Sequence, residues 1–122
     1  MRIIKIKKVP LSRKYYVMEI KFDKKYLSEL YYYGKCSDKK HRYQPQIVKN
    51  YKKCIDLLEG VPCVESLYKY HALKYEKLKG EKGDLESIRV NDQYRIEFKT
   101  KQVESETIIT VCNIIELSNH YK

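Results

Sequence analysis

The sequence predicts a single α+β domain in which an antiparallel sheet of three to five strands carries two main helices on one face. Three observations support this. Residues 16–22 alternate between apolar and polar side chains, as in a half-buried strand. Residues 45–58 have the apolar stripe of an amphipathic helix. Three strand-like segments then follow between residues 86 and 115. Helices and strands in separate blocks are typical of an α+β fold, and 122 residues is the length of one domain.

The first half of the chain contains signals for both helices. Asp23 can cap a first helix, which Gly34 would end. Pro45 suits the first position of a second helix, whose end we expect at Gly60. We expect its buried stripe to consist of Ile47, Val48, Tyr51, Cys54, Ile55 and Leu58. A shorter helical turn should follow, with Val64, Leu67 and Tyr68 facing inward.

The two strands around Asn91 define the register of a hairpin. A two-residue turn would pair Ile88 with Arg95, whereas a three-residue loop over residues 91–93 pairs Ile88 with Ile96. We therefore expect the three-residue loop, which places Arg89 opposite Arg95 on the other face. Like charges in that position repel. The pair is either a solvated surface softened by Glu97 or a site for an anion, because arginine presents a planar fork of donors suited to phosphate.

The last strand is expected at the centre of the sheet. Residues 107–115 carry apolar side chains at both alternating positions, as in a strand covered on both faces. The chain then closes with a short tail that contains His120.

Composition restricts the classes of function. The chain has 26 Lys and Arg residues against 16 Asp and Glu residues, a formal charge of +10. That excess favours a polyanionic partner, most often nucleic acid, although an acidic protein or a membrane surface would also suit it. No apolar run is long enough for a membrane span and no signal peptide is evident, so we expect a cytoplasmic protein. The three histidines and four cysteines have no metal-ligand spacing, so we expect no metal and no cofactor.

The basic loop before the second helix contains Lys39, Lys40, His41 and Arg42. We favour a solvated surface for it. A contact to nucleic-acid or ribosomal phosphates is the alternative.

Several short motifs in order resemble the HigB-like branch of the RelE/ParE toxin superfamily. They are Leu78-Lys79-Gly80, Ser87 to Asn91, Tyr94 to Phe98 and the ending Cys112 to Lys122. The likeness covers about residues 18 to 122. Residues 1–17 would then be an N-terminal extension or an extra edge strand, residues 18–122 the toxin domain, and Met18 a candidate native start.

The resemblance implies a small microbial-ribonuclease-like fold and ribosome-dependent cleavage of mRNA that arrests growth. It also implies a helix-turn-helix antitoxin, HigA-like, as partner. Arg95 matches the strand arginine that holds the scissile phosphate, Arg89 matches a basic strand position, His120 the C-terminal catalytic histidine and Lys79 the loop lysine. We further expect RNA contacts from Lys74, Lys99, Tyr94 and Tyr121.

Two departures from the family pattern affect the proton-transfer groups. Glu76 stands where many such toxins have a histidine, and Ser118-Asn119 replaces an acidic and aromatic pair before His120. Metal-free cleavage of RNA needs a base, an acid and positive charge at the phosphate. His120 could serve as acid or base and Glu76 as the other group, so their assignment stays open. Two alternatives also stay open, a ParE-like inhibitor of gyrase and a non-catalytic RNA-binding module.

Overall fold

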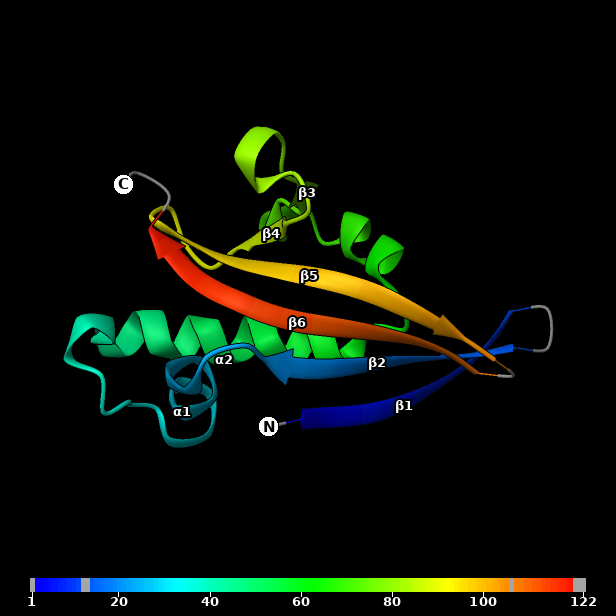
Figure 1. The fold of residues 1–122 in the computed structure, drawn as a ribbon, viewed down its shortest axis with the longest axis horizontal. Helices are drawn as coiled ribbons and strands as arrows, with labels where there is room; N and C mark the ends of the chain where they lie inside the picture. Colours follow the sequence, from blue (N-terminus) through cyan, green and yellow to red (C-terminus); the bar gives the residue numbers. More distant parts are fainter. Residues whose placement is uncertain (1, 12–13, 106, 120–122) are drawn as a thin grey trace.

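The structure is a computed structural model that describes residues 2–11, 14–105 and 107–119. Six strands form one sheet in the order β1-β2-β6-β5-β4-β3, so β6 is central, as the sequence predicts (Figure 1). The α+β class is confirmed, and the sheet is one strand larger than expected because the loop before the hairpin adds a two-residue strand. The strands are β1 (Arg2–Leu11), β2 (Lys14–Phe22), β3 (Glu76–Lys77), β4 (Glu86–Arg89), β5 (Tyr94–Glu104) and β6 (Thr107–Asn119).

One strand pair departs from the antiparallel pattern that we expected. β2 and β6 run parallel, whereas all other neighbours are antiparallel. The cause is visible in Figure 1: β1 meets β2 and β5 meets β6 at the same end of the molecule. β2, which follows β1, and β6, which follows β5, therefore leave that end in the same direction. β1 occupies the sheet edge, and the expected boundary between residues 17 and 18 falls inside β2.

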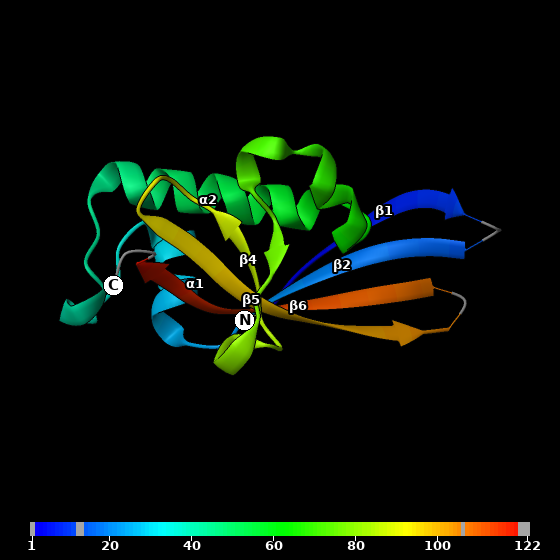
Figure 2. The ribbon, with the colours of Figure 1, turned by 90° about the horizontal axis from the view of Figure 1, so that it is seen from above.

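Two helices, α1 (Lys25–Tyr33) and α2 (Pro45–Gly60), lie against one face of the sheet (Figure 2). Gly34 ends α1 in the left-handed region at φ 75°, as expected. The N-cap is Lys24, so the prediction of Asp23 was wrong. The Asp23 N–H donates to the Ile114 carbonyl of the sheet (2.8 Å), and the first turn of the helix is closed by the Leu27 N–H, which donates to the Lys24 carbonyl (3.1 Å).

The hydrophobic core lies between these helices and the sheet. The predicted stripe of α2 is buried except for Ile47, which is partly buried against the core. Tyr68 does not point inward as expected and is 59% exposed. Further core side chains come from the strands: Met18, Ile20, Ile88, Ile96, Phe98, Cys112, Ile114 and Leu117.

Short 3-10 turns cover Lys39–His41, Val64–Lys69, His71–Leu73 and Gly80–Lys82. No helix in the described ranges is both long and apolar enough to cross a membrane.

The predicted hairpin loop is confirmed. Ile88 pairs with Ile96, Arg89 pairs with Arg95, and the Val90 N–H donates to the Tyr94 carbonyl (3.0 Å). The Asn91 side chain closes the loop, since its Oδ1 accepts from the backbone N–H groups of Gln93 (2.9 Å) and Tyr94 (2.7 Å).

Candidate functional site

Arg95 lies on the sheet face opposite the helices, which we call the open face. The register places it between Arg89 on β4 and Ser118 on β6. Its neighbours on this face enclose a cavity of about 180 Å³. The cavity is lined by Glu76, Leu78, Lys82, Ser87, Arg95, Glu97, Ser118 and Asn119. The structure thus brings two predicted catalytic residues, Arg95 and Glu76, to one cavity, together with the end of the strand that leads to His120.

The guanidinium of Arg95 is held by the hairpin backbone. Its Nη1 donates to the carbonyl oxygens of Asn91 (2.6 Å) and Tyr94 (3.1 Å). Both bonds use the same nitrogen, whereas a guanidinium carries five N–H donors. Among the described residues, no carboxylate forms an ion pair with Arg95. The side chain is therefore fixed in place and retains donors for an anion.

Arg89 does not join this cavity. Its Nη2 donates to Oδ1 of Asp92 in the hairpin loop, where the Asp92 side chain is 86% exposed. The backbone pairing of Arg89 with Arg95 is the one that the sequence predicts, but a pair of guanidiniums around one anion is not formed. Asp92 instead relieves the repulsion between the two arginines.

A row of carboxyl groups crosses the open face next to Arg95. Glu76 pairs with Ser87, Ser87 with Glu97 and Glu97 with Glu116. Glu97 is only 5% exposed and accepts from Lys82 Nζ at 2.7 Å. This ion pair fixes the loop around Lys82 over the sheet. Glu76 lies at the exposed rim, where a carboxylate is accessible for proton transfer.

The predicted RNA contacts fall in different places. Lys74, Lys79 and Lys99 are exposed, and Lys74 adopts a left-handed backbone at φ 46°. Tyr94 points to the helix side of the sheet, where its half-buried ring packs edge-on against Tyr43 at 5.4 Å. His120 and Tyr121 lie outside the described residues. The described residues contain no group of His, Cys, Asp and Glu side chains that could hold a metal ion.

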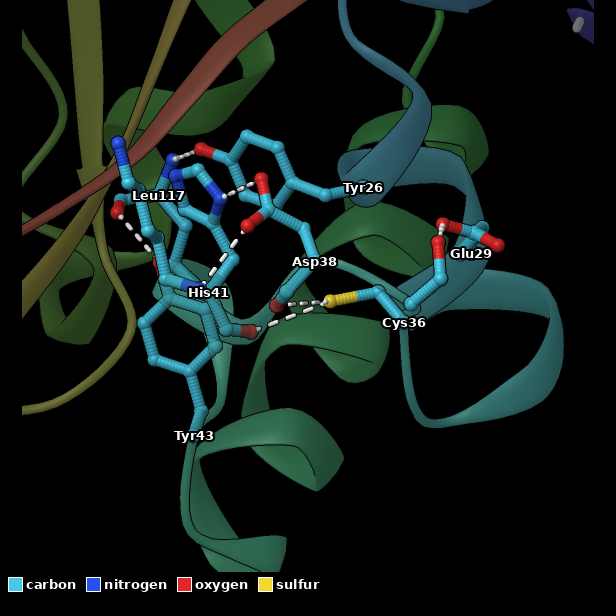
Figure 3. Close-up of polar contacts among 9 residues, drawn as sticks. Tyr26, Glu29, Cys36, Asp38, His41, Tyr43 and Leu117 are labelled. Atoms are coloured by element: carbon cyan, nitrogen blue, oxygen red, sulfur yellow. Dashed lines mark hydrogen bonds and ion pairs between the residues drawn. The ribbon is translucent and has the colours of Figure 1, made fainter.

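Two tyrosines that sequence reasoning missed hold the end of β6 (Figure 3). β2 pairs with β6 only as far as Ile114, so within the part of the chain that the structure describes the last residues of β6 have no strand neighbour on that side. The Leu117 N–H donates to the Tyr26 hydroxyl (3.2 Å), and the Tyr43 hydroxyl donates to the Leu117 carbonyl (3.2 Å). The two phenols replace the missing strand and position Ser118 beside Arg95. Their separation of 91 and 74 residues from Leu117 leaves no signal in the sequence.

We expect loss of these hydroxyls to loosen the end of β6. Tyr43→Phe should lower the free energy of unfolding by about 0.5–1.5 kcal/mol, the net value of one hydrogen bond. Tyr26→Phe should cost about 1–3 kcal/mol, because it leaves the Leu117 N–H unpaired in a buried position. Urea unfolding measures both effects, and amide exchange at Leu117 should speed up. Tyr33→Phe is the control, since Tyr33 is 67% exposed. Equal stability of all three variants would contradict the assignment.

Buried tyrosine hydroxyls also make the free energy of unfolding depend on pH in the alkaline range. Burial raises the pKa of Tyr26 to about 12, and burial raises the pKa values of Tyr43 and Tyr51 as well. Unfolded phenols ionise near pH 10, so above that pH the unfolded state loses protons that the folded state keeps. The contribution of these three phenols to the free energy of unfolding should therefore be constant below about pH 9 and fall as the pH rises from 10 to 12. Tyr51→Phe should show a shallower fall. A urea midpoint that is the same at pH 8 and pH 11 would contradict this expectation.

The site can therefore hold an anion and transfer a proton. Arg95 supplies fixed positive charge and Glu76 supplies a carboxylate at the rim, whereas the charge of Lys82 at the wall is engaged by Glu97. These are groups suited to a phosphodiester in the cavity.

The sequence model of a family described as the RelE-like toxin of the type II toxin-antitoxin system HigB matches residues 20–111. One similar solved structure is a YoeB/ParE toxin from Agrobacterium tumefaciens, at 16% identity and a TM-score of 0.49. That alignment covers 84% of this chain and 98% of the other. No curated protein sequence gives a significant match. The family match includes Glu76 and Arg95 and ends before the last residues of β6.

Proposed function

The chain belongs to the HigB-like family of RelE-like toxins of type II toxin-antitoxin systems, and on that premise we propose that it is a metal-independent endoribonuclease that cuts mRNA on the ribosome and arrests growth. The observation that carries the proposal is Arg95, an arginine fixed by backbone carbonyls that keeps donors free in a cavity with a carboxylate at its rim. As a toxin of a type II system the protein pairs with a cognate antitoxin.

Arg95 would bind the phosphate that is cleaved. In such a reaction the 2′-hydroxyl attacks the adjacent phosphorus, the bond to the 5′-oxygen breaks, and charge accumulates on the non-bridging oxygens. A guanidinium that is already in position stabilises that charge without reorganisation. Because Asn91 and Tyr94 engage only Nη1, the remaining donors of Arg95 can face the phosphate.

Glu76 and His120 would transfer the protons. One takes the proton of the attacking 2′-hydroxyl and the other donates a proton to the leaving 5′-oxygen. Glu76 lines the cavity from β3, and His120 follows Asn119, which lines the same cavity from β6. An imidazole titrates near neutral pH and suits either role.

The RNA would approach over a basic rim. Lys74, Lys79 and Lys99 are exposed and can contact flanking phosphates without a fixed register. Tyr121 would stack on a base from the tail, whereas Tyr94 is half-buried and would offer one face of its ring. We propose that the antitoxin is a HigA-like helix-turn-helix protein, and that the toxin acts in the cytoplasm, where mRNA is translated.

Mapping of transcript ends tests the function. After induction in a bacterium, new 5′ ends should appear within translated reading frames as growth stops. DNA damage signalling with intact transcripts would instead indicate a gyrase inhibitor. Unimpaired growth with salt-dependent RNA binding, with log K falling by about 0.7 per phosphate contacted, would indicate a binding module without catalysis. Either of these two results would overturn the proposal.

A further inference from the structure

A second cavity, of about 400 Å³, lies at the end of β6. One wall is the basic loop Lys40, His41 and Arg42, and the rings of Tyr43 and Tyr94 line it as well. Ser118 and Asn119 line both this cavity and the cavity of Arg95. The two cavities are therefore neighbours on either side of the last residues of β6, and one extended ligand could occupy both.

The basic loop is held in one conformation by its own hydrogen bonds, as Figure 3 shows around Asp38. The carboxylate of Asp38 accepts from the Lys40 N–H (2.9 Å) and is bound to His41 Nδ1 (2.8 Å). The Cys36 thiol donates to the His41 carbonyl (3.3 Å). Lys40 and Arg42 are exposed, as the expected solvated surface requires, and the loop that carries them is ordered by these bonds.

The imidazole of His41 is also positioned by its ring. It stacks on Tyr26 with centroids 3.6 Å apart and planes 9° apart. Tyr26 in turn accepts the hydrogen bond from the Leu117 N–H. Because Asp38 engages Nδ1, Nε2 is the nitrogen that remains for a ligand, and among the described residues it makes no hydrogen bond. The loop is thus joined to the strand end that borders the first cavity.

The charges and rings of this cavity suit a nucleotide. Lys40 and Arg42 are exposed cations on the loop side, and Arg42 can bind a phosphate through two donors. Glu116 is the carboxylate in the lining, on β6, so a phosphate would keep to the loop side. The half-buried rings of Tyr43 and Tyr94 offer an aromatic surface to a base. The volume lies within the usual range for small-ligand sites.

We propose that this cavity is a second nucleotide site, which binds the RNA nucleotide that flanks the cleaved phosphate. Its phosphate contacts Lys40, Arg42 and Nε2 of His41, and its base lies against the tyrosines. The strand crosses the end of β6 at Ser118 and Asn119 between the two sites. This inference rests on the proposed function, since it takes RNA as the substrate.

Binding of uncleavable RNA tests the second site apart from catalysis. The probe is a 2′-O-methyl oligoribonucleotide of six nucleotides, compared with one of two nucleotides that fills only one site. The double variant Lys40→Ala/Arg42→Ala should bind the longer RNA at least tenfold more weakly at low salt. The magnitude of its slope of log K against log salt should fall by roughly 0.7, the value for the one phosphate that both side chains contact. Binding of the dinucleotide should change little.

The control removes two charges elsewhere. Lys69→Ala/Lys101→Ala replaces two exposed lysines outside both cavities and should leave the ratio of the two affinities unchanged. Thermal unfolding of both double variants checks that the fold is retained. Suppose that the wild type cuts mRNA and that the Lys40/Arg42 variant binds both RNAs with the same affinities as the Lys69/Lys101 variant. The second site is then wrong and the proposed function stands. If the wild type binds the longer RNA through these residues but cuts no mRNA, the ribonuclease proposal is wrong and the site stands.

Discussion

Replacement of Arg95 by lysine is expected to remove most of the toxicity and to lower the rate of mRNA cleavage by about 100-fold or more. Loss of one preorganised donor to a developing oxyanion typically has an effect of that size. Lysine keeps the charge but loses the planar fork that the carbonyls of Asn91 and Tyr94 hold in place. Growth after induction and the rate of cleavage on purified ribosomes measure the effect.

Two further variants test whether the effect is specific to Arg95. Lys101→Ala removes an exposed charge on the same strand outside both cavities and should remain fully toxic. Arg89→Ala should have a smaller effect than Arg95→Lys, because Asp92 already engages Arg89 outside the cavity. Full toxicity of the Arg95 variant would exclude it from the chemistry.

Replacement of His120 by alanine is expected to lower cleavage by about 10²–10⁴-fold, the usual contribution of a general acid or base. Glu76→Gln removes the other candidate while keeping the shape of the side chain. If the two groups act on one phosphate, the double variant should be little slower than the slower single variant, because the effects of groups that act together are not additive.

The matched control for the tail is Lys122→Ala, which alters the same segment without removing a titrating group. Measurement of cleavage against pH separates the two roles, since loss of the base and loss of the acid flatten opposite limbs of the profile. If His120→Ala and Glu76→Gln both cleave at the wild-type rate, the proton-transfer assignment is wrong.

The local sequence pattern was sufficient to predict much of the fold. The parity argument for residues 88 to 96 gave the correct hairpin register, because a one-residue slip would move every apolar side chain to the other face. Pro45 and Gly34 marked helix ends correctly, since both act through their own backbone geometry. The resemblance to HigB-like toxins is confirmed by the family match.

The features that the sequence did not reveal depend on contacts between distant segments. Asp23 still bonds to the sheet through Ile114, 91 residues later, and Lys24 takes the N-cap position of α1. The parallel pairing of β2 with β6 follows from the way two strand pairs meet side by side. Asp92, which binds Arg89, lies only three residues later in the chain. Whether Arg89 binds this neighbour or points into the cavity nevertheless depends on the three-dimensional arrangement. The hydrogen bonds of Tyr26 and Tyr43 to Leu117 likewise join segments that are far apart in the sequence.

The central claim is that the cavity at Arg95 receives the phosphate that is cleaved. The structure of the toxin trapped on a ribosome, with an mRNA made uncleavable by 2′-O-methylation, tests it most directly. The account predicts a phosphate within hydrogen-bond distance of the Arg95 guanidinium, with Glu76 on one side and Ser118 on the other. An mRNA whose phosphates all lie outside this cavity while the toxin is bound would contradict it.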